Sequence, residues 1–395
     1  MYMHILQFKE IKKAREIFLD GYMYIHEMNG GNYQMKSLFD ETKLGSLKLK
    51  NRFIRSATYE GMADEKGHMT EALFEIYKEL SEGGVGTIIT GLAAVTDLEE
   101  LIPGQMGIYD DSFIEEYKKV TEIAHENGAN IIIQFAGAGT QTIKNEEKIM
   151  WGPSNITDLG YKNKPKEMTI QEINYLQTAF ENAALRAKEA GFDGIQIHAA
   201  HGYLISKFLT PYYNNRTDEY GGSIENRSRM LLEIYRKIRN KVGLEYPIII
   251  KINCEDFMND GMSFEECKYL CKKLEEEGID AIEISGGSLS SRPNESYSRR
   301  ITKGQKPYYL SYAQKIKEEV NIPIISVGGI RDIISLETIL NENSIEYFSL
   351  SRPLICESDL IKRWSEGDRK PSKCISCGNC SGFGKTICIF NKSRA

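Results

Sequence analysis

The sequence predicts an α/β protein whose main part, residues 35–370, folds as a TIM (β/α)8 barrel. Eight short apolar runs alternate with longer amphipathic segments from Asn51 onward. These runs are apolar throughout, which is typical of parallel strands covered on both faces. Eight β–α repeats in roughly 300 residues match the size of such a barrel. A doubly wound open sheet is the alternative, but no G-x-G-x-x-G follows the first predicted strand.

Residues 1–34 match nothing that follows and form a predicted N-terminal extension. One hypothesis is a mis-assigned start, with translation beginning at Met35. Gly30-Gly31 can be encoded as GGA-GGT, a bacterial ribosome-binding sequence, and three codons separate it from Met35. The other hypothesis is a genuine but dispensable N-terminal arm.

The predicted elements follow in order. The eight strands are Arg52–Arg55, Gly86–Thr90, Asn130–Phe135, Gly194–His198, Pro247–Ile252, Ala281–Ser285, Pro323–Val327 and Tyr347–Leu350. Between them, apolar residues at spacings of three and four predict helices over Phe113–Asn127, Ile170–Ala190, Glu225–Val242 and Ser263–Glu277. Gly128, Gly191 and Gly278 follow three of these helices, as residues that end a helix commonly do.

Composition limits the possible functions. Fifty Lys and Arg against 56 Asp and Glu give a net charge of −6, which disfavours broad nucleic-acid binding. No apolar run approaches the roughly 18 residues of a transmembrane helix, so no membrane partner is expected. The first residues do not resemble an export signal, and eight cysteines are too few for a disulfide scaffold. We therefore expect a reducing, cytoplasmic setting.

Chemistry in a TIM barrel lies at the carboxyl ends of its strands. Gly328-Gly329 follows the seventh predicted strand and Ser351-Arg352 follows the eighth. Glycine lets backbone N–H groups approach a phosphate closely, and arginine adds a bidentate charge. The loops after strands seven and eight commonly bind phosphate, so a phosphate site is predicted here rather than a plain turn with a surface arginine.

The fourth predicted strand ends in His198-Ala199-Ala200-His201-Gly202-Tyr203. Two imidazoles at this spacing could donate hydrogen bonds to one substrate oxygen, and Tyr203 could supply a proton. They could also bind zinc, although no Asp, Glu or Cys accompanies them locally. Structural histidines beneath a loop are the remaining alternative.

The long polar loop over residues 208–227 is predicted to shape the rim of the site rather than to react. Arg216 and Asp218 are expected to pair and to hold this loop in place.

Taken together, these motifs resemble the Old Yellow Enzyme family of FMN-dependent oxidoreductases. The resemblance rests on three motifs: His-Ala-Ala-His-Gly-Tyr-Leu, the later Asn-x-Arg-x-Asp-x-Tyr-Gly-Gly-Ser-x-Glu-Asn-Arg, and Leu49-Lys50-Asn51-Arg52-Phe53 near the start. The chain is most similar to the bacterial NADH:flavin oxidoreductase branch, which includes 2,4-dienoyl-CoA reductase and trimethylamine dehydrogenase. The resemblance extends from about Leu38 to the C-terminus.

This resemblance implies an FMN at the mouth of the barrel. Ser56, Ala57 and Thr58 would hold the isoalloxazine, and Tyr59 would lie beside N5. Gln134 would bond the pyrimidine ring, and Lys251 would lie near N1 and the C2 oxygen. The phosphate would bind at Gly328, Gly329, Ser351 and Arg352.

The resemblance also implies the reaction. NADH or NADPH would reduce the flavin, which would pass hydride to a small activated alkene such as an enone. His198 and His201 would hold the substrate oxygen while Tyr203 donates the proton. Relatives are often oligomeric, so a homo-oligomer is a further expectation.

Two departures from the family pattern affect the site. Relatives often carry Thr, Cys or His where Tyr59 stands. Many read Gln-Leu-x-His-x-Gly-Arg after the third strand, where this chain has Gln134-Phe135-Ala136-Gly137-Ala138-Gly139-Thr140. The missing His and Arg leave more room and less charge there.

The last 25 residues, 371–395, form a predicted cysteine-containing tail. Cys374, Cys377, Cys380 and Cys388 could ligate a [4Fe–4S] cluster or zinc, or could remain free thiols. The family branch carries a cluster just after the barrel, with a similar C-x-x-C-x-x-C start. The remaining cysteines, Cys254, Cys267, Cys271 and Cys356, are predicted to be ordinary buried residues.

Two functions other than an FMN oxidoreductase stay open at this point. One is a flavin-free, phosphate-binding barrel lyase or isomerase. The other is a redox sensor or electron carrier built around the cysteine tail.

Overall fold

The computed structural model describes residues 35–143, 147–302, 304–380 and 384–394. The hypotheses about residues 1–34 therefore lie outside the described residues. Leu38–Ala395 form one compact unit. Within the described ranges, no helix has the length and apolar character needed to cross a bilayer.

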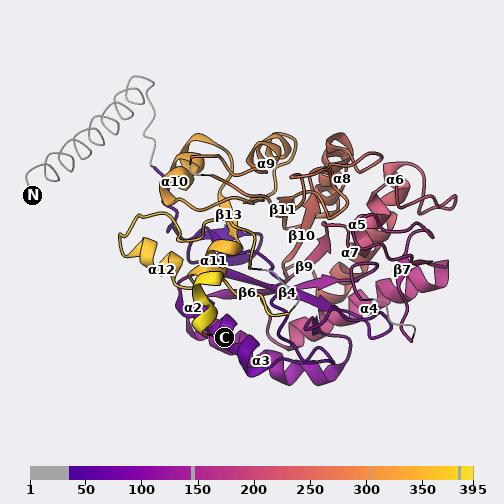
Figure 1. The fold of residues 1–395 in the computed structure, drawn as a ribbon, viewed down its shortest axis with the longest axis horizontal. Coiled ribbons are helices and arrows are strands. Elements are labelled where there is room, and N and C mark those ends of the chain that lie inside the picture. Colours follow the sequence, from indigo (N-terminus) through magenta and orange to yellow (C-terminus); the bar gives the residue numbers. More distant parts are fainter. Residues whose placement is uncertain (1–34, 144–146, 303, 381–383, 395) are drawn as a thin grey trace, which may run out of the picture. The chain divides into compact units, whose positions relative to one another are not determined.

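Eight parallel strands close into a barrel, which confirms the predicted TIM fold (Figure 1). Their order around the barrel is β3-β13-β12-β11-β10-β9-β6-β4, and β3 pairs with β4 to close it. The barrel strands are β3 Phe53–Arg55, β4 Thr87–Ala94, β6 Asn130–Ala136, β9 Gly194–Ala199, β10 Ile248–Asn253, β11 Ala281–Ser285, β12 Ile324–Val327 and β13 Tyr347–Leu350. Each predicted strand is present, and nearly all of their residues are buried, as their apolar sequences require.

A small antiparallel hairpin packs on the amino half of the barrel. Its strands are β1 Thr42–Leu44 and β2 Leu47–Leu49. Leu44 and Leu49 are buried in a cluster with strand residues that include Ile54, Ile89 and Ile132. This cluster fills the barrel interior away from the carboxyl ends of the strands, so the opposite end is left for a site.

Helices surround the strands, as Figure 1 shows. They are α2 Glu71–Glu82, α3 Ile114–Glu126, α4 Ile170–Glu189, α5 Leu204–Leu209, α6 Ile224–Arg227, α7 Arg229–Val242, α8 Phe264–Glu277, α9 Leu310–Lys317, α10 Ile333–Glu342, α11 Arg352–Cys356 and α12 Leu360–Ser365. Capping boxes begin α4 at Thr169 and α8 at Ser263. The single helix predicted over Glu225–Val242 is wrong in one respect, because Ser228 separates α6 from α7.

Short elements complete the chain. They are β5 Met106–Gly107, which adds to β4, the paired strands β7 Trp151–Gly152 and β8 Lys166–Glu167, and the 3₁₀ turns η1 Asp111–Phe113 and η2 Ile389–Arg394.

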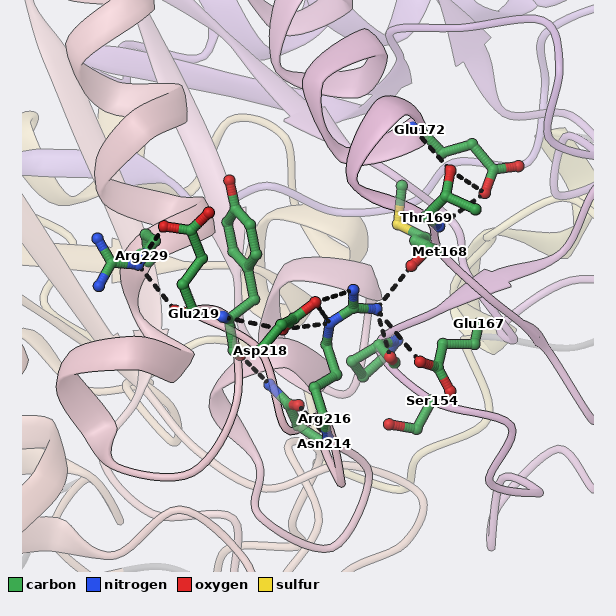
Figure 2. A network of polar contacts seen from close by, with 12 residues as sticks. Ser154, Glu167, Met168, Thr169, Glu172, Asn214, Arg216, Asp218, Glu219 and Arg229 are labelled. Atoms are coloured by element: carbon green, nitrogen blue, oxygen red, sulfur yellow. Dashed lines mark hydrogen bonds and ion pairs between the residues drawn. The ribbon is translucent and has the colours of Figure 1, made fainter.

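The long loop after α5 is held by one buried arginine (Figure 2). Nη1 of Arg216 donates to the carbonyl oxygens of Pro153 at 3.0 Å and Met168 at 2.6 Å. Its Nε and Nη2 pair with the carboxylate of Asp218 at 2.5–3.2 Å. The predicted Arg216–Asp218 pair is confirmed, and the two carbonyl bonds of Arg216 tie this loop to the residues that directly follow β7 and β8.

Candidate active site

The carboxyl ends of the barrel strands surround a cavity of about 830 Å³. Every predicted catalytic and cofactor-binding residue lines it, although these residues come from six different strand ends or the loops that follow them. They are Ser56, Ala57, Thr58, Tyr59, Gln134, His198, His201, Tyr203, Lys251, Gly328, Gly329, Ser351 and Arg352.

One end of the cavity forms a backbone cradle. Gly328 and Gly329 have φ angles of 94° and 86°, in the left-handed region that favours glycine. A Cβ atom on Gly328 would lie 2.4 Å from the ring of Tyr308. Across the cradle, the Thr58 and Ser351 hydroxyls lie 2.8 Å apart. Arg352 begins α11 and donates to the carbonyl oxygen of Arg299 at 2.8 Å. Backbone amides at two glycines, a hydroxyl and a guanidinium fit the phosphate of FMN.

The floor of the cavity carries a buried cation. Lys251 on β10 donates to the hydroxyl of Ser56 at 2.8 Å and lies 3.3 Å from the carboxylate of Glu283 on β11. Burial lowers the pKa of Lys251, while Glu283 acts to raise it. A cation here fits the negative charge that a reduced flavin carries near N1.

Two amides continue this floor toward β6. Gln134 Nε2 donates to Gln196 Oε1 at 2.7 Å, and Gln196 Nε2 donates to Glu283 at 2.8 Å. Neither Gln196 nor Glu283 was among the predicted site residues. The available signal was a polar residue within an otherwise apolar strand, in Gly194-Ile195-Gln196-Ile197 and Ala281-Ile282-Glu283-Ile284.

The opposite wall brings His198, His201 and Tyr203 together. The imidazole centroids lie 5.1 Å apart, and the Tyr203 ring lies 4.7 Å from that of His198. Burial, together with the Lys251 charge, holds the pKa of both histidines well below the usual range, so both are neutral at neutral pH. Burial raises the pKa of Tyr203 well above 10, so its phenol keeps its proton. The arrangement therefore offers neutral N–H donors beside a protonated phenol.

Ser285 and Tyr297 also contact His201. His201 Nε2 lies 2.7 Å from the Ser285 hydroxyl, and the centroid of the Tyr297 ring lies 4.9 Å from that of His201 with the two rings tilted. His201 itself has a φ of 63°, which is uncommon for a residue with a side chain. Sequence reasoning missed Ser285 and Tyr297, because they reach His201 from the end of β11 and from the loop that follows it, far away in the sequence.

The loop after β6 departs from the family pattern, and the side chains that it presents to the cavity are uncharged. Gln141, Thr142 and Ile143 line the cavity there. Gln141 Nε2 donates to the carbonyl oxygen of His201 at 2.6 Å. The buried carboxyl of Glu99 accepts from the Gly139 amide at 2.9 Å, and burial raises its pKa to about 7.

Tyr59 lies in the cavity wall, where its phenol donates to the carbonyl oxygen of Pro103. Burial, with Glu60 adding, raises the pKa of Tyr59. Tyr161 and Tyr297 line the same cavity, so the substrate side is largely aromatic.

The cysteine tail closes part of the cradle end. Cys374, Ser376 and Cys380 line the cavity, and the amide of Thr386 donates to the carbonyl oxygen of Glu60 at 2.7 Å. Cys356 is buried, as predicted, and it packs with Cys374 and Cys388.

The structure gives no support to the predicted metal site at the thiols of the tail. Burial raises the pKa of Cys380 to about 11 and that of Cys356 to about 12. Across the described ranges, no group of three or more His, Cys, Asp or Glu side chains is arranged to hold a metal ion. The [4Fe–4S] and zinc predictions therefore gain no support.

Known proteins share this architecture. A profile of the NADH:flavin oxidoreductase / NADH oxidase family matches residues 37–370. The NADH oxidase of Thermoanaerobacter brockii is 36% identical over 353 residues, which are 88% of this chain and 54% of that protein. This chain thus spans little more than half the length of that relative.

Two solved structures are similar. 2-Naphthoyl-CoA reductase in complex with 2-naphthoyl-CoA is 28% identical, with a TM-score of 0.84, covering 91% of this chain and 57% of that one. An old yellow enzyme homologue from Zymomonas mobilis is 24% identical, with a TM-score of 0.73 over 86% and 96% of the two chains, and shows the fold alone.

Proposed function

Because the chain belongs to the NADH:flavin oxidoreductase / NADH oxidase family, we propose that it is an FMN-dependent NAD(P)H oxidoreductase that reduces activated alkenes. The observation that carries the proposal is the convergence of all thirteen predicted residues on one cavity. A glycine cradle lies at one end, a buried cation on the floor, and a His–His–Tyr set on one wall. A flavin-free phosphate enzyme would have no evident use for all three.

Different residues of the chain would bind different parts of FMN. The Gly328-Gly329 backbone, Ser351 and Arg352 would hold the FMN phosphate, and Gln134 with Lys251 would hold the pyrimidine edge. When bound, FMN accepts hydride from NADH or NADPH and passes it to the substrate.

His198 and His201 then orient the substrate oxygen. As neutral imidazoles, they would donate hydrogen bonds to a carbonyl and stabilise the negative charge that develops on it. Tyr203, which keeps its proton, would donate it to the carbon next to that carbonyl. Tyr161 and Tyr297 favour a planar, conjugated substrate and limit access of water.

A visible spectrum taken without oxygen tests the flavin. We expect a band near ~450 nm that bleaches with NADH or NADPH and returns with 2-cyclohexenone. A colourless protein that takes up no added FMN would refute the proposal and favour the phosphate-binding lyase or isomerase.

Tyr203→Phe tests the proton donor. Loss of a general acid should slow the return of colour with 2-cyclohexenone by roughly 10²–10⁴-fold, because the phenol proton is gone. Bleaching by NADH should keep its native rate. Tyr161→Phe is the matched control, since it removes another phenol from the lining of the same cavity and leaves that of Tyr203 in place. Equal rates in native protein and Tyr203→Phe would remove Tyr203 from the mechanism.

The cysteines support a reducing, cytoplasmic setting, which we also propose. All eight are free thiols, including the Cys267–Cys271 pair with sulfurs 3.9 Å apart on α8.

A further inference from the structure

Glu283 is a carboxylate enclosed within the barrel, beneath the cavity that it does not itself line. It has no exposed surface. Its Oε1 accepts from the Ser56 hydroxyl at 2.8 Å and lies 3.3 Å from Lys251 Nζ, while its Oε2 accepts from Gln196 at 2.8 Å. A buried carboxylate at such a position is costly unless each oxygen is used, and here each is.

The direction of these hydrogen bonds fixes the orientation of two side-chain amides, those of Gln196 and Gln134. An ionised carboxylate only accepts, so Gln196 must present its Nε2 to Glu283 and its Oε1 to Gln134. Gln134 then donates with Nε2, and its Oε1 is left for the cavity. Glu283 therefore decides, through Gln196, which end of Gln134 is available to a ligand.

The same carboxylate lies 3.3 Å from the ammonium of Lys251, the charged residue of the cavity floor described above. Besides Glu283, the charged or titratable groups near Lys251 are Arg55 on β3, His198 on β9 and His201 just after β9. Arg55 disfavours a second cation and is itself paired with the Glu60 carboxylate at 2.9 Å, and the histidines are neutral and add no negative charge. Burial also opposes the charge of Lys251. Glu283 is thus the group that keeps the ammonium in this dry position.

We propose that Glu283 is a positioning residue that keeps Lys251 protonated in both redox states and, through Gln196, sets the orientation of Gln134 toward FMN. This inference rests on the FMN binding proposed above. Its consequence is a proton count. With Lys251 already charged, adding two electrons to oxidised flavin takes up one proton and leaves an anionic reduced flavin. Without Glu283, Lys251 is neutral before reduction, so a second proton is taken up with the two electrons.

The test is the pH dependence of the flavin reduction potential, measured by anaerobic dithionite titration of the FMN-loaded protein against indicator dyes between pH 7 and 9. A tenfold change in proton concentration is worth about 30 mV per proton for a two-electron couple. Native protein should therefore show about 30 mV per pH unit, and Glu283→Gln about 60 mV per pH unit.

Matched variants separate the two roles. Glu357→Gln is the control, because Glu357 is also buried and ion-paired, with Arg363, but lies outside the cavity lining. It should keep the native slope. Gln196→Leu interrupts the path to Gln134 and spares the Lys251–Glu283 pair, so it should weaken FMN binding roughly tenfold without changing the slope.

The outcomes are distinct. A native slope near 60 mV per pH unit, or an unchanged slope in Glu283→Gln, would overturn the inference while leaving a flavoprotein. If Glu283→Gln loses its flavin, the slopes of Glu283→Asp and of the native protein test the inference instead. Glu283→Asp retains the negative charge, so it should still take up one proton per two electrons. Unchanged FMN affinity in Gln196→Leu would overturn the orienting role. A protein without flavin would overturn the proposed function itself.

Discussion

Glu99 should make the protein less stable as pH rises from 4.5 to about 7. Its carboxyl is 4% exposed and holds the loop after β6 through the amide of Gly139, at 2.9 Å. Burial raises its pKa from the ordinary 4.5 to about 7. A raised carboxyl pKa favours the protonated form in the folded state, so its stabilising contribution is present below pH 4.5 and is lost progressively as pH rises to about 7.

The size of this effect follows from the pKa difference. A tenfold change in proton affinity corresponds to about 1.4 kcal/mol, so the rise from 4.5 to about 7 amounts to about 3 kcal/mol. At the unfolding entropy typical of a barrel this long, that energy corresponds to a shift of about 4 °C in the thermal midpoint.

The assay compares thermal midpoints of native protein and Glu99→Gln from pH 5 to pH 8.5. The amide oxygen of Gln still accepts from Gly139, and it carries no charge to desolvate. The variant should therefore approach native stability at pH 5 and exceed it at pH 8.5 by about 4 °C. Comparing the two proteins cancels the other groups that titrate in this range. Parallel midpoint curves across the pH range would refute the pKa argument.

Two further substitutions test the architecture. Gly329→Ala should weaken FMN binding at least roughly tenfold, since the added Cβ would lie 2.7 Å from Ile301 and alanine would have to adopt the left-handed region. Fluorescence titration with FMN measures the affinity. Gly367→Ala, with a similar φ and nothing within 4 Å of the added Cβ, should bind FMN normally. Arg216→Ala should lower the free energy of unfolding by roughly 3 kcal/mol, because two buried carbonyls lose their donor (Figure 2). Denaturant unfolding measures this loss. A loss no larger than that of Arg229→Ala, whose side chain is more exposed, would contradict the expectation.

The barrel could be predicted because its signals are local. A strand buried on both faces must be apolar along its length, and the runs at Ala281–Ser285 and Tyr347–Leu350 coincide with β11 and β13 to the residue. Helix ends are equally local, since caps and glycines act within one turn. The break at Ser228 was missed because the amphipathic pattern continues through it.

The cofactor-binding and catalytic candidates were also within reach of the sequence. A barrel places the carboxyl ends of its strands on one rim, so residues such as His198, Lys251 and Gly329 share a cavity once the strands are recognised. Their motifs carry the family resemblance, and the family profile confirms it.

The sequence by itself therefore determined three features: the eight buried strands, the polar residues at their carboxyl ends and the family. Only the tertiary structure decided which groups support the site from behind. Ser56 and Glu283 are 227 residues apart, yet their side chains lie 2.8 Å apart. Cys356 at the end of α11 meets Cys374 and Cys388 of the tail in one buried cluster. Such contacts depend on how segments that are separate in the sequence come together in the folded chain, and a local pattern carries no information about that distance.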